Sequence, residues 1–304
     1  MNKRKFFLSM VITMAFLVLF YCVWTLLYAN PDFQGALDMG TGNKTTVLVV
    51  GVDKEGKRSD VNMLFSVDAK AKTIRLLSIP RDTRVKLPNG SYSKINACIG
   101  KENGEAVLIQ TVKDLTGLPI NDFCKVNFLA LRNIIDILGG VSYDVPINMD
   151  YDDPVQDLHI HLKAGPQTLN GEQAEGLLRF RSGYANADLG RINTQQDFIK
   201  ELIKQKMRPR YMFHAFPVVK EITENLETDM SAMYIMKYAW AFRNSEKTDF
   251  ASYTLPGTPK SINGVAYYIC DKNATEDLIR TEFGTETKKT VVNDGNSVNE
   301  KVIE

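Results

Sequence analysis

The sequence has almost no net charge. It contains 37 Lys and Arg residues against 36 Asp and Glu residues, which gives a formal charge of +1. A protein this close to neutral has no overall field to attract nucleic acid or anionic lipid, so any anion site must be a local cluster of basic residues. The balance excludes a chain that binds polyanions over its whole surface.

Cysteines and nucleotide-binding motifs are also scarce. The chain has four cysteines. Cys22 lies in an apolar run, and Cys98, Cys124 and Cys270 follow it, so at most one disulfide can join these three. They form no Cys-x-x-Cys pair, and we interpret them as free thiols. No Gly-x-x-x-x-Gly-Lys loop is present, which argues against a nucleoside triphosphate as substrate.

One long stretch lacks charge altogether. Residues 6–28 are almost wholly apolar and follow three consecutive basic residues. A helix of about 23 residues spans the hydrocarbon core of a bilayer, and basic residues stay on the cytoplasmic side. The pattern predicts a cytoplasmic N-terminus (1–5), a single-pass membrane anchor (6–28) and an extracytoplasmic remainder in the cell membrane. A cleaved signal peptide would have a shorter apolar run ending in small residues.

Beyond the anchor, apolar runs alternate with helical patterns. Residues 29–45 predict a polar linker and residues 282–304 a disordered tail. Residues 46–281 contain no Pro/Gly-rich break, which predicts a single α/β domain. The predicted strands are 46–52, 61–67, 73–79, 141–145, 158–162, 250–255 and 265–269. The predicted helices are 104–115, 128–138, 171–178, 190–207, 212–223, 231–242 and 274–280.

Two aspartates flank the turn between the first two predicted strands. Asp53 directly follows one strand and Asp60 directly precedes the next, with Arg58 between them. Carboxylates at neighbouring strand ends suit Mg²⁺, which accepts one or two of them and leaves positions for phosphate oxygens. Aspartate is also common in turns, and on spacing alone this simpler interpretation is favoured.

A second charged pair, Arg81-Asp82, follows the predicted strand 73–79. Open α/β sheets bind ligands at strand ends of this kind. The planar guanidinium of Arg81 suits a phosphate, and Asp82 can orient that guanidinium. A surface ion pair is the alternative.

A third group of charged residues lies further along the chain. Arg179 and Arg181 point the same way if their segment is extended. Arg191 and Gln195 share one face of the following helix, shortly after Asp188. Arginines that converge on one spot repel each other unless an anion lies among them. Together the three groups predict phosphoryl transfer, in which a metal ion and arginines neutralise the transferring phosphate.

An ordered series of motifs occupies residues 47–205. It comprises VLVVGVD, RSDVNMLFSVD, LLSIPRDT, KINACIG, GLPINDFCKVNF, ILGGVSYDVP, LKAGPQTLNGEQAEGLLRFRSG and ADLGRINTQQDFI. In this order the motifs resemble the LytR-CpsA-Psr family of Gram-positive cell-envelope proteins. The resemblance implies a single three-layer α/β/α domain with a central mixed sheet. It also implies an apolar channel for a polyprenyl chain. Helices 107–115 and 128–138 are candidates to line it, although their apolar stripes suit an ordinary core equally well.

The resemblance further implies a membrane-anchored phosphotransferase. Such enzymes move a glycopolymer, such as wall teichoic acid or capsular polysaccharide, from an undecaprenyl-pyrophosphate carrier to a peptidoglycan hydroxyl. By motif, Asp53 and Asp60 would hold Mg²⁺, with Mn²⁺ as an alternative. The residues that would be catalytic are Arg81, Asp82, Arg179, Arg181, Asp188 and Arg191. The residues that would bind the pyrophosphate are Arg58, Arg81, Arg179, Arg181, Arg191 and Gln195.

The chain departs from the family pattern at two positions. Glu55 replaces an arginine of the first motif, and Thr194 replaces the second arginine of the helix motif. Each change removes a basic group from the region expected to bind phosphate. Lys54 or Lys57 is a candidate replacement for the first.

The sequence also bears on three other functions. A membrane-bound transcriptional regulator is not expected, because DNA lies on the side that receives only residues 1–5, and DNA binding needs many basic residues there. No nucleic-acid partner is therefore predicted. A polyprenyl-pyrophosphate hydrolase, which uses water in place of the sugar hydroxyl, stays open. So does a non-catalytic binder of lipid-linked glycan, although the Asp53/Asp60 pair argues against it.

Two polar segments are interpreted as ordinary surface. His159 and His161 share one face of a predicted strand, a spacing that can bind zinc, but no third ligand is evident nearby in the sequence. Asp150, Asp152 and Asp153 are interpreted as a solvated acidic loop rather than a calcium site.

Overall fold

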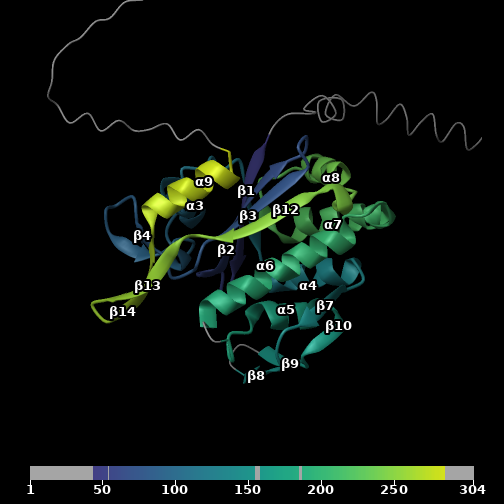
Figure 1. Ribbon diagram of the computed structural model, residues 1–304, viewed down its shortest axis with the longest axis horizontal. Helices are drawn as coiled ribbons and strands as arrows, with labels where there is room; N and C mark the ends of the chain where they lie inside the picture. The colour runs from purple at the N-terminus through teal and green to yellow at the C-terminus, as the bar shows by residue number, and fades with distance from the viewer. Residues whose placement is uncertain (1–43, 54, 155–157, 185–186, 285–304) are drawn as a thin grey trace, which may run out of the picture.

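The computed structural model describes residues 44–284, apart from residue 54, residues 155–157 and residues 185–186 (Figure 1). The predicted anchor at 6–28, nearly all of the predicted linker and residues 285–304 of the predicted tail lie outside the described residues. Among the helices of the described part, none combines the length and the apolar character needed to cross a bilayer.

The centre of the fold is a mixed sheet of six strands in the order β11-β6-β1-β2-β3-β12. The strands are β1 (Thr45–Val52), β2 (Ser59–Asp68), β3 (Thr73–Ser78), β6 (Asp122–Val126), β11 (Glu227–Thr228) and β12 (Asp249–Thr254). β1, β2 and β3 form an antiparallel meander, while β6 runs parallel to β1 and β12 parallel to β3. The expected central mixed sheet is thus confirmed.

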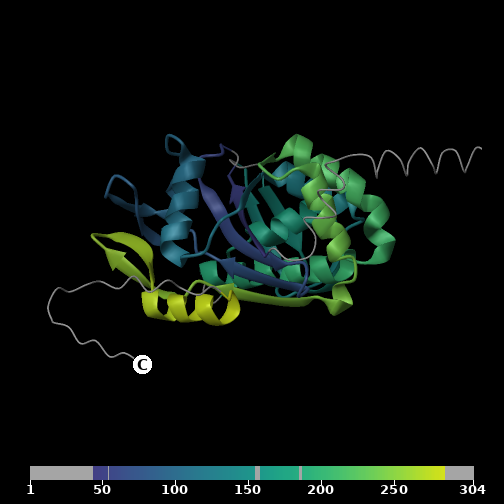
Figure 2. The same ribbon diagram turned by 90° about the horizontal axis from the view of Figure 1, so that it is seen from above.

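Helices cover both faces of this sheet (Figures 1 and 2). On one face lie α3 (Gly104–Thr116) and α9 (Lys272–Glu282). Leu108 and Val112 of α3 are fully buried in a core with Leu48 and Leu64. The apolar stripe of α3 therefore belongs to an ordinary core, and the helix stops where Gly117 adopts a φ of 69°.

The other face carries a long helix and a helical pair, namely α6 (Ala187–Lys206), α7 (Met212–Asn225) and α8 (Ala232–Ala241). Gln196 of α6 donates hydrogen bonds to the Ser78 hydroxyl of β3 and to the Tyr253 carbonyl of β12. Lys72, after β2, donates to the carbonyl of Ala241 at the end of α8. The bonds from Gln196 hold the middle of α6 against the ends of β3 and β12, and the bond from Lys72 holds the end of α8 near the β2–β3 turn.

A second core lies beside the sheet, around α4 (Phe128–Ile137) and α5 (Gly171–Arg179). Two hairpin-like pairs accompany it. The first joins β7 (Val141–Val145) to β10 (Gly165–Leu169), and the second joins β8 (Met149–Asp153) to β9 (Leu158–Leu162). Residues 150–153 thus form a strand, and their interpretation as a loop was wrong.

The remaining elements are short. They are β4 (Arg84–Lys86), β5 (Tyr92–Lys94), β13 (Gly257–Ile262) and β14 (Val265–Cys270), with 3₁₀ turns at Ile95–Ala97, Pro209–Tyr211 and Ser245–Lys247. Every helix and strand predicted between residues 46 and 281 is present within a few residues of its predicted ends. Cys98, Cys124 and Cys270 are free thiols, as interpreted.

Candidate functional site

A break in strand register occurs at Asp60, near the start of the central strand β2. Gly51 pairs with Val61 and Val52 pairs with Ser59, so Asp60 is the extra residue of a β-bulge in β2. Bulges leave one residue out of the ladder and re-aim its side chain. The carboxylate of Asp60 therefore leaves the regular alternation of β2 and meets side chains from other elements.

Arg81 reaches Asp60 from the end of β3. A tight turn holds its segment, because both the backbone N–H and the hydroxyl of buried Thr83 donate to the carbonyl of Pro80, at 2.9 and 2.6 Å. Nη1 of Arg81 donates to Oδ1 of Asp60 at 2.6 Å, and its Nε lies 3.7 Å from Oδ1 of Asp188. Arg81 thereby bridges two carboxylates.

The first turn of α6 supplies Asp188 and Arg191. Nη2 of Arg191 lies 2.7 Å from Oδ1 of Asp188, a spacing of three residues on one helix face. The same nitrogen donates to the backbone carbonyl of Asp60 at 3.3 Å. Gly190 lets Tyr184 pack directly on this turn of α6, since a Cβ there would lie 2.6 Å from the Cβ of Tyr184.

Arg181 completes the group, with Nη2 3.2 Å from Oδ1 of Asp60. We call Asp60, Arg81, Arg181, Asp188 and Arg191 the arginine–aspartate cluster. Three guanidinium groups face two carboxylates, so the cluster carries an excess of one positive charge. An anion at its surface would relieve the repulsion among the arginines.

The surroundings shift the pKa values of the cluster. Burial alone would raise the pKa of Asp60, but the hydrogen bond from Arg81 and the charges of Arg181, Arg81 and Arg191 hold it below its usual value. Burial and the neighbouring positive charges lower the pKa of Arg191 to about 10, against the favourable charge of Asp188. Asp60 is therefore ionised and Arg191 charged at neutral pH.

A small cavity lies beneath the cluster. It has a volume of about 10 Å³ and is lined by Asp60, Asn62, Arg81, Arg191 and Gln195, among others. This is the size of one water molecule, so an anion larger than a water molecule has room only at the exposed rim. Arg191 is only 2% exposed, whereas Arg81 and Arg181 are 24% and 41% exposed and form that rim.

Asn62 was missed by sequence reasoning. Its side chain is 2% exposed, and neither its amide nitrogen nor its oxygen has a hydrogen-bond partner among the described residues. Buried polar groups of this kind normally bond to protein or to ordered water. The side chain of Asn62 therefore gives the cavity wall unused hydrogen-bonding capacity. The available signal was an amide inside the otherwise apolar run VNMLF.

The residues predicted to hold Mg²⁺ lie at the two ends of the β1–β2 turn. Oδ1 of Asp53 accepts hydrogen bonds from the backbone N–H groups of Lys57 and Arg58, at 2.9 and 3.3 Å. Asp53 therefore also stabilises the β1–β2 turn, the simpler interpretation given for it from the sequence. The side-chain contacts of Asp60 likewise fall on Oδ1, which leaves one oxygen of each carboxylate for another ligand. This donor set fits a hard divalent cation.

Several predicted site residues have other partners. Arg179 is the last residue of α5 rather than part of an extended segment, so it does not share the direction assumed for Arg181. Its Nη1 lies 2.7 Å from Oε1 of buried Glu175, which also pairs with Arg132, and its guanidinium stacks on the Phe128 ring. The Arg132–Glu175 ion pair and the stacking of Arg179 on Phe128 hold α5 against α4.

Asp82 does not orient Arg81. It pairs with Nζ of Lys94 at 2.9 Å, whereas Arg81 pairs with Asp60 and Asp188. Gln195 lines the cavity and donates to the carbonyl of Leu178.

The two departures from the family pattern also have structural partners. Glu55 pairs with Lys57 in solvent, at 3.1 Å. The buried hydroxyl of Thr194, three residues after Arg191 on α6, donates to the Tyr184 hydroxyl at 2.9 Å. A small buried residue therefore takes the place of a second arginine on this turn of α6.

Comparison with known proteins places this geometry in context. Residues 29–283 match the model of the LytR_cpsA_psr family. The chain is 30% identical over 230 residues to the polyisoprenyl-teichoic acid–peptidoglycan teichoic acid transferase TagV of Bacillus subtilis, a match covering 74% of this chain and 59% of TagV. It is 27% identical over 249 residues to TagU of Bacillus licheniformis, which carries the same transferase name, covering 81% of this chain and 79% of TagU.

The fold agrees with these matches. The crystal structure of B. subtilis TagV superposes with a TM-score of 0.67 at 28% sequence identity, covering 80% of this chain and 96% of that one. Because the family match extends over most of the sequence, the chain belongs to the LytR-CpsA-Psr family.

Proposed function

We propose that the chain is a membrane-anchored phosphotransferase. It moves a glycopolymer, such as teichoic acid or a capsular or related polysaccharide, from an undecaprenyl-pyrophosphate carrier to a hydroxyl of peptidoglycan. The names of the relatives TagV and TagU support the class of carrier, polymer and acceptor. The span predicted at residues 6–28 would anchor the chain in the cell membrane with its catalytic domain outside.

One observation carries the proposal, namely the convergence of Arg81, Arg181 and Arg191 on Asp60 and Asp188 at one sheet edge. Phosphoryl transfer requires charge stabilisation and positioning more than covalent chemistry. Guanidinium groups already fixed by carboxylates need little reorganisation when the phosphate charge develops. The two more exposed arginines would contact the diphosphate, and buried Arg191 would hold Asp188 and the Asp60 backbone in place.

The proposed reaction uses this placement. The acceptor hydroxyl attacks the phosphorus nearer the sugar, the bond from that phosphorus to the bridging oxygen breaks, and undecaprenyl phosphate leaves with the electron pair. The hydroxyl proton is released during the attack. Arg81 and Arg181 would stabilise the charge on the transferring phosphate, and the spare positive charge of the cluster would favour the anionic leaving group. Asp82 stays a candidate for assisting proton removal.

Asp53 and Asp60 would hold Mg²⁺, or Mn²⁺, through their second carboxylate oxygens. When bound, the ion would supply further neutralisation of phosphate charge. Arg58, on the same turn, is a candidate for contact with the same phosphate, and Gln195 is a candidate by motif. Arg179, also a candidate by motif, would have to leave its pair with Glu175 to reach it.

Incubation of the full-length protein with undecaprenyl-pyrophosphoryl glycan and peptidoglycan, with and without Mg²⁺, tests the proposal. We expect polymer to become attached to peptidoglycan and undecaprenyl phosphate to be released in equal amount, only when the ion is present. Release without attachment would identify a hydrolase. Binding of the lipid-linked glycan without any release would contradict the proposal and indicate a carrier-binding protein.

A further inference from the structure

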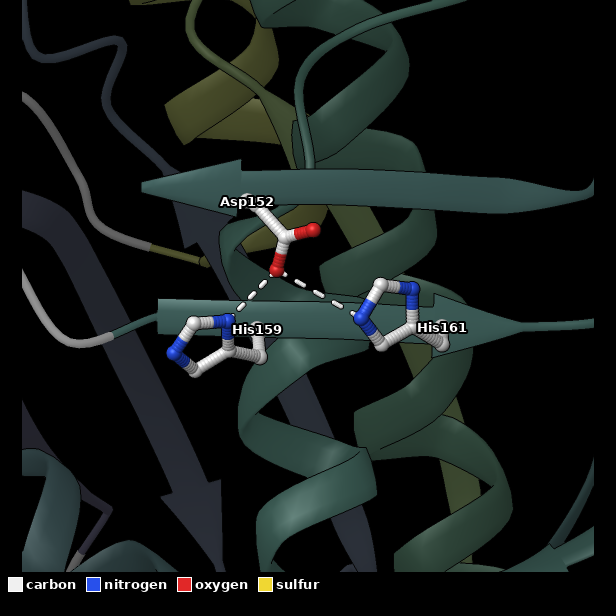
Figure 3. A group of neighbouring side chains, drawn as sticks. All are labelled: Asp152, His159 and His161. Atoms are coloured by element: carbon white, nitrogen blue, oxygen red, sulfur yellow. Dashed lines mark hydrogen bonds and ion pairs between the residues drawn. The ribbon is translucent and has the colours of Figure 1, made fainter. Parts of the chain in front are cut away.

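A second charged cluster lies on the β8–β9 hairpin, outside the arginine–aspartate cluster. The strands pair Asp152 with His159 and Asp150 with His161. Figure 3 shows the carboxylate of Asp152 reaching from its strand to the imidazoles of His159 and His161 on the neighbouring strand. Oδ1 of Asp152 lies 2.5 Å from Nδ1 of His159 and 3.4 Å from Nε2 of His161. This supplies the third ligand that sequence reasoning did not find.

The hairpin is a firm support for these side chains. The alternate residues Leu158, Ile160 and Leu162 point inward and are buried in the second core. Gly176 of α5 lies directly against Ile160, where an added Cβ would be 3.4 Å from the isoleucine side chain. Because residues alternate between faces, burying one face fixes His159 and His161 together on the exposed one.

The contact with Asp150 orients the imidazole of His161 so that its other nitrogen faces Asp152. Nδ1 of His161 lies 2.6 Å from Oδ1 of Asp150, which is the carboxylate–histidine arrangement that commonly supports a metal-bound imidazole. When His161 is neutral and its Nδ1–H donates to Asp150, its Nε2 lone pair faces the carboxylate of Asp152, 3.4 Å away. A lone pair and a carboxylate oxygen repel each other unless a proton or a cation lies between them.

The separations are close to those that a metal needs. Zinc binds imidazole nitrogen at about 2.0–2.1 Å and carboxylate oxygen at about 2.0–2.2 Å. Tetrahedral ligands at such lengths lie about 3.4 Å apart, which the 3.4 Å between His161 Nε2 and Asp152 Oδ1 already matches. The shorter contact from Asp152 to His159 would open by about 1 Å, within reach of a side-chain rotation on an exposed strand.

We propose that His159, His161 and Asp152 form a binding site for a divalent transition-metal ion such as Zn²⁺, with Asp150 orienting His161. Two imidazoles favour Zn²⁺, Cu²⁺ or Ni²⁺ over Mg²⁺ and Ca²⁺, which prefer oxygen ligands. Three protein ligands leave one coordination position for water or for a ligand group. The site is independent of the proposed transferase activity.

Zinc titration tests the site directly. The full-length protein, prepared without a histidine tag, is titrated with ZnCl₂ by calorimetry in a buffer that does not bind metals. We expect one zinc ion per chain and no displacement by excess MgCl₂. The double variant H159A/H161A should lose this binding, and Asp152→Asn and Asp150→Asn should each weaken it at least tenfold.

Two control variants test whether zinc binds at the hairpin site rather than at another histidine or carboxylate. The chain contains only three histidines, so His214→Ala removes the one outside the hairpin. Asp153→Asn removes a carboxylate from the opposite face of β8. Both should bind zinc as the wild type does. The proposal is wrong if H159A/H161A, shown by circular dichroism to be folded, still binds one zinc ion with unchanged affinity, or if excess MgCl₂ displaces the zinc.

Discussion

The two charged clusters combine similar residue types with opposite charge balance. At the sheet edge, three arginines exceed two aspartates, and Arg191 is 2% exposed. On the β8–β9 hairpin, two aspartates face two histidines whose side chains are 54% and 58% exposed. The first has a fixed positive excess and suits an anion. The second offers carboxylate oxygens and imidazole nitrogens and suits a cation.

The clusters also differ in how they are assembled. The arginine–aspartate cluster draws on β2, the segment after β3, the segment after α5 and the first turn of α6, so it exists only when the whole fold is formed. The hairpin cluster needs two adjacent strands. We therefore expect substitutions in the first to affect both stability and activity, and substitutions in the second to affect metal binding alone.

Arg191→Ala should have the largest effect on transfer. The variant removes a buried guanidinium that holds Asp188 and the Asp60 carbonyl, and loss of a preorganised charge-stabilising group typically costs about 100- to 1000-fold in rate. The rate of undecaprenyl phosphate release measures the loss. Arg191→Lys should recover only part of it, because a lysine cannot reproduce the planar fork.

Arg280→Ala is the control for this variant. Arg280 forms an exposed pair with Asp277 at the same three-residue spacing on a helix, with a side chain that is 64% exposed. It should transfer polymer at the wild-type rate. If folded Arg191→Ala did the same, the cluster would not be the catalytic centre.

Asp60→Asn distinguishes two roles of that carboxylate. If Asp60 holds the metal as proposed, the variant should lose about 100-fold in transfer rate. Its affinity for inorganic pyrophosphate without Mg²⁺ should rise, because the positive excess of the cluster grows by one. Calorimetry and the transfer assay check the two effects. Wild-type transfer together with tighter pyrophosphate binding would mean that Asp60 only balances the arginines.

Arg179 and Arg181 should separate stability from activity. Arg179→Ala removes one of the two arginines that pair with buried Glu175, and loss of a hydrogen bond to a buried charged group costs about 2 kcal/mol of unfolding free energy. Arg181→Ala removes a more exposed group and should cost less than 1 kcal/mol, within the usual range for exposed pairs. Its transfer rate should nevertheless fall at least tenfold. Urea unfolding and the transfer assay compare the two, and the reverse pattern would contradict this assignment.

The smallest effect is a pH dependence of stability. The folded-state pKa of Asp60 lies below the ordinary value of 3.8, so its stabilising contribution is complete above that pH and is lost as the pH falls through the lower folded-state pKa. The unfolding free energies of wild type and Asp60→Asn should differ by about 1 kcal/mol at neutral pH. This difference should shrink below pH 3.8. A difference that grows in acid would contradict the ion pairing.

Much of the fold was predictable from local pattern. The runs at 46–52 and 61–67 and the helical stripe at 104–115 predict their elements because burial of one face imposes a period of two or of 3.6 residues. The strands β4, β5, β6, β8, β10, β11 and β13 were missed. They are short or polar and become strands only through the partners they pair with.

The candidate site was predictable in membership but not in pairing. Asp60, Arg81, Asp188 and Arg191 were named from charged motifs at element ends, and the structure brings all four together. The bulge at Asp60 and the partnership of Asp82 with Lys94 were not foreseeable. Both depend on which segment lies opposite, and the pattern of a single segment does not contain that information.

The sequence by itself determined which residues carry charge, which faces are apolar and where the helices and the more apolar strands lie. Only the tertiary structure decided that Arg179 pairs with Glu175, that Arg181 joins Asp60, and that Asp152 lies across from His159. The physical reason is that side-chain periodicity fixes the direction of a residue within its own element. The partner it meets is fixed by the register and packing between elements distant in the chain.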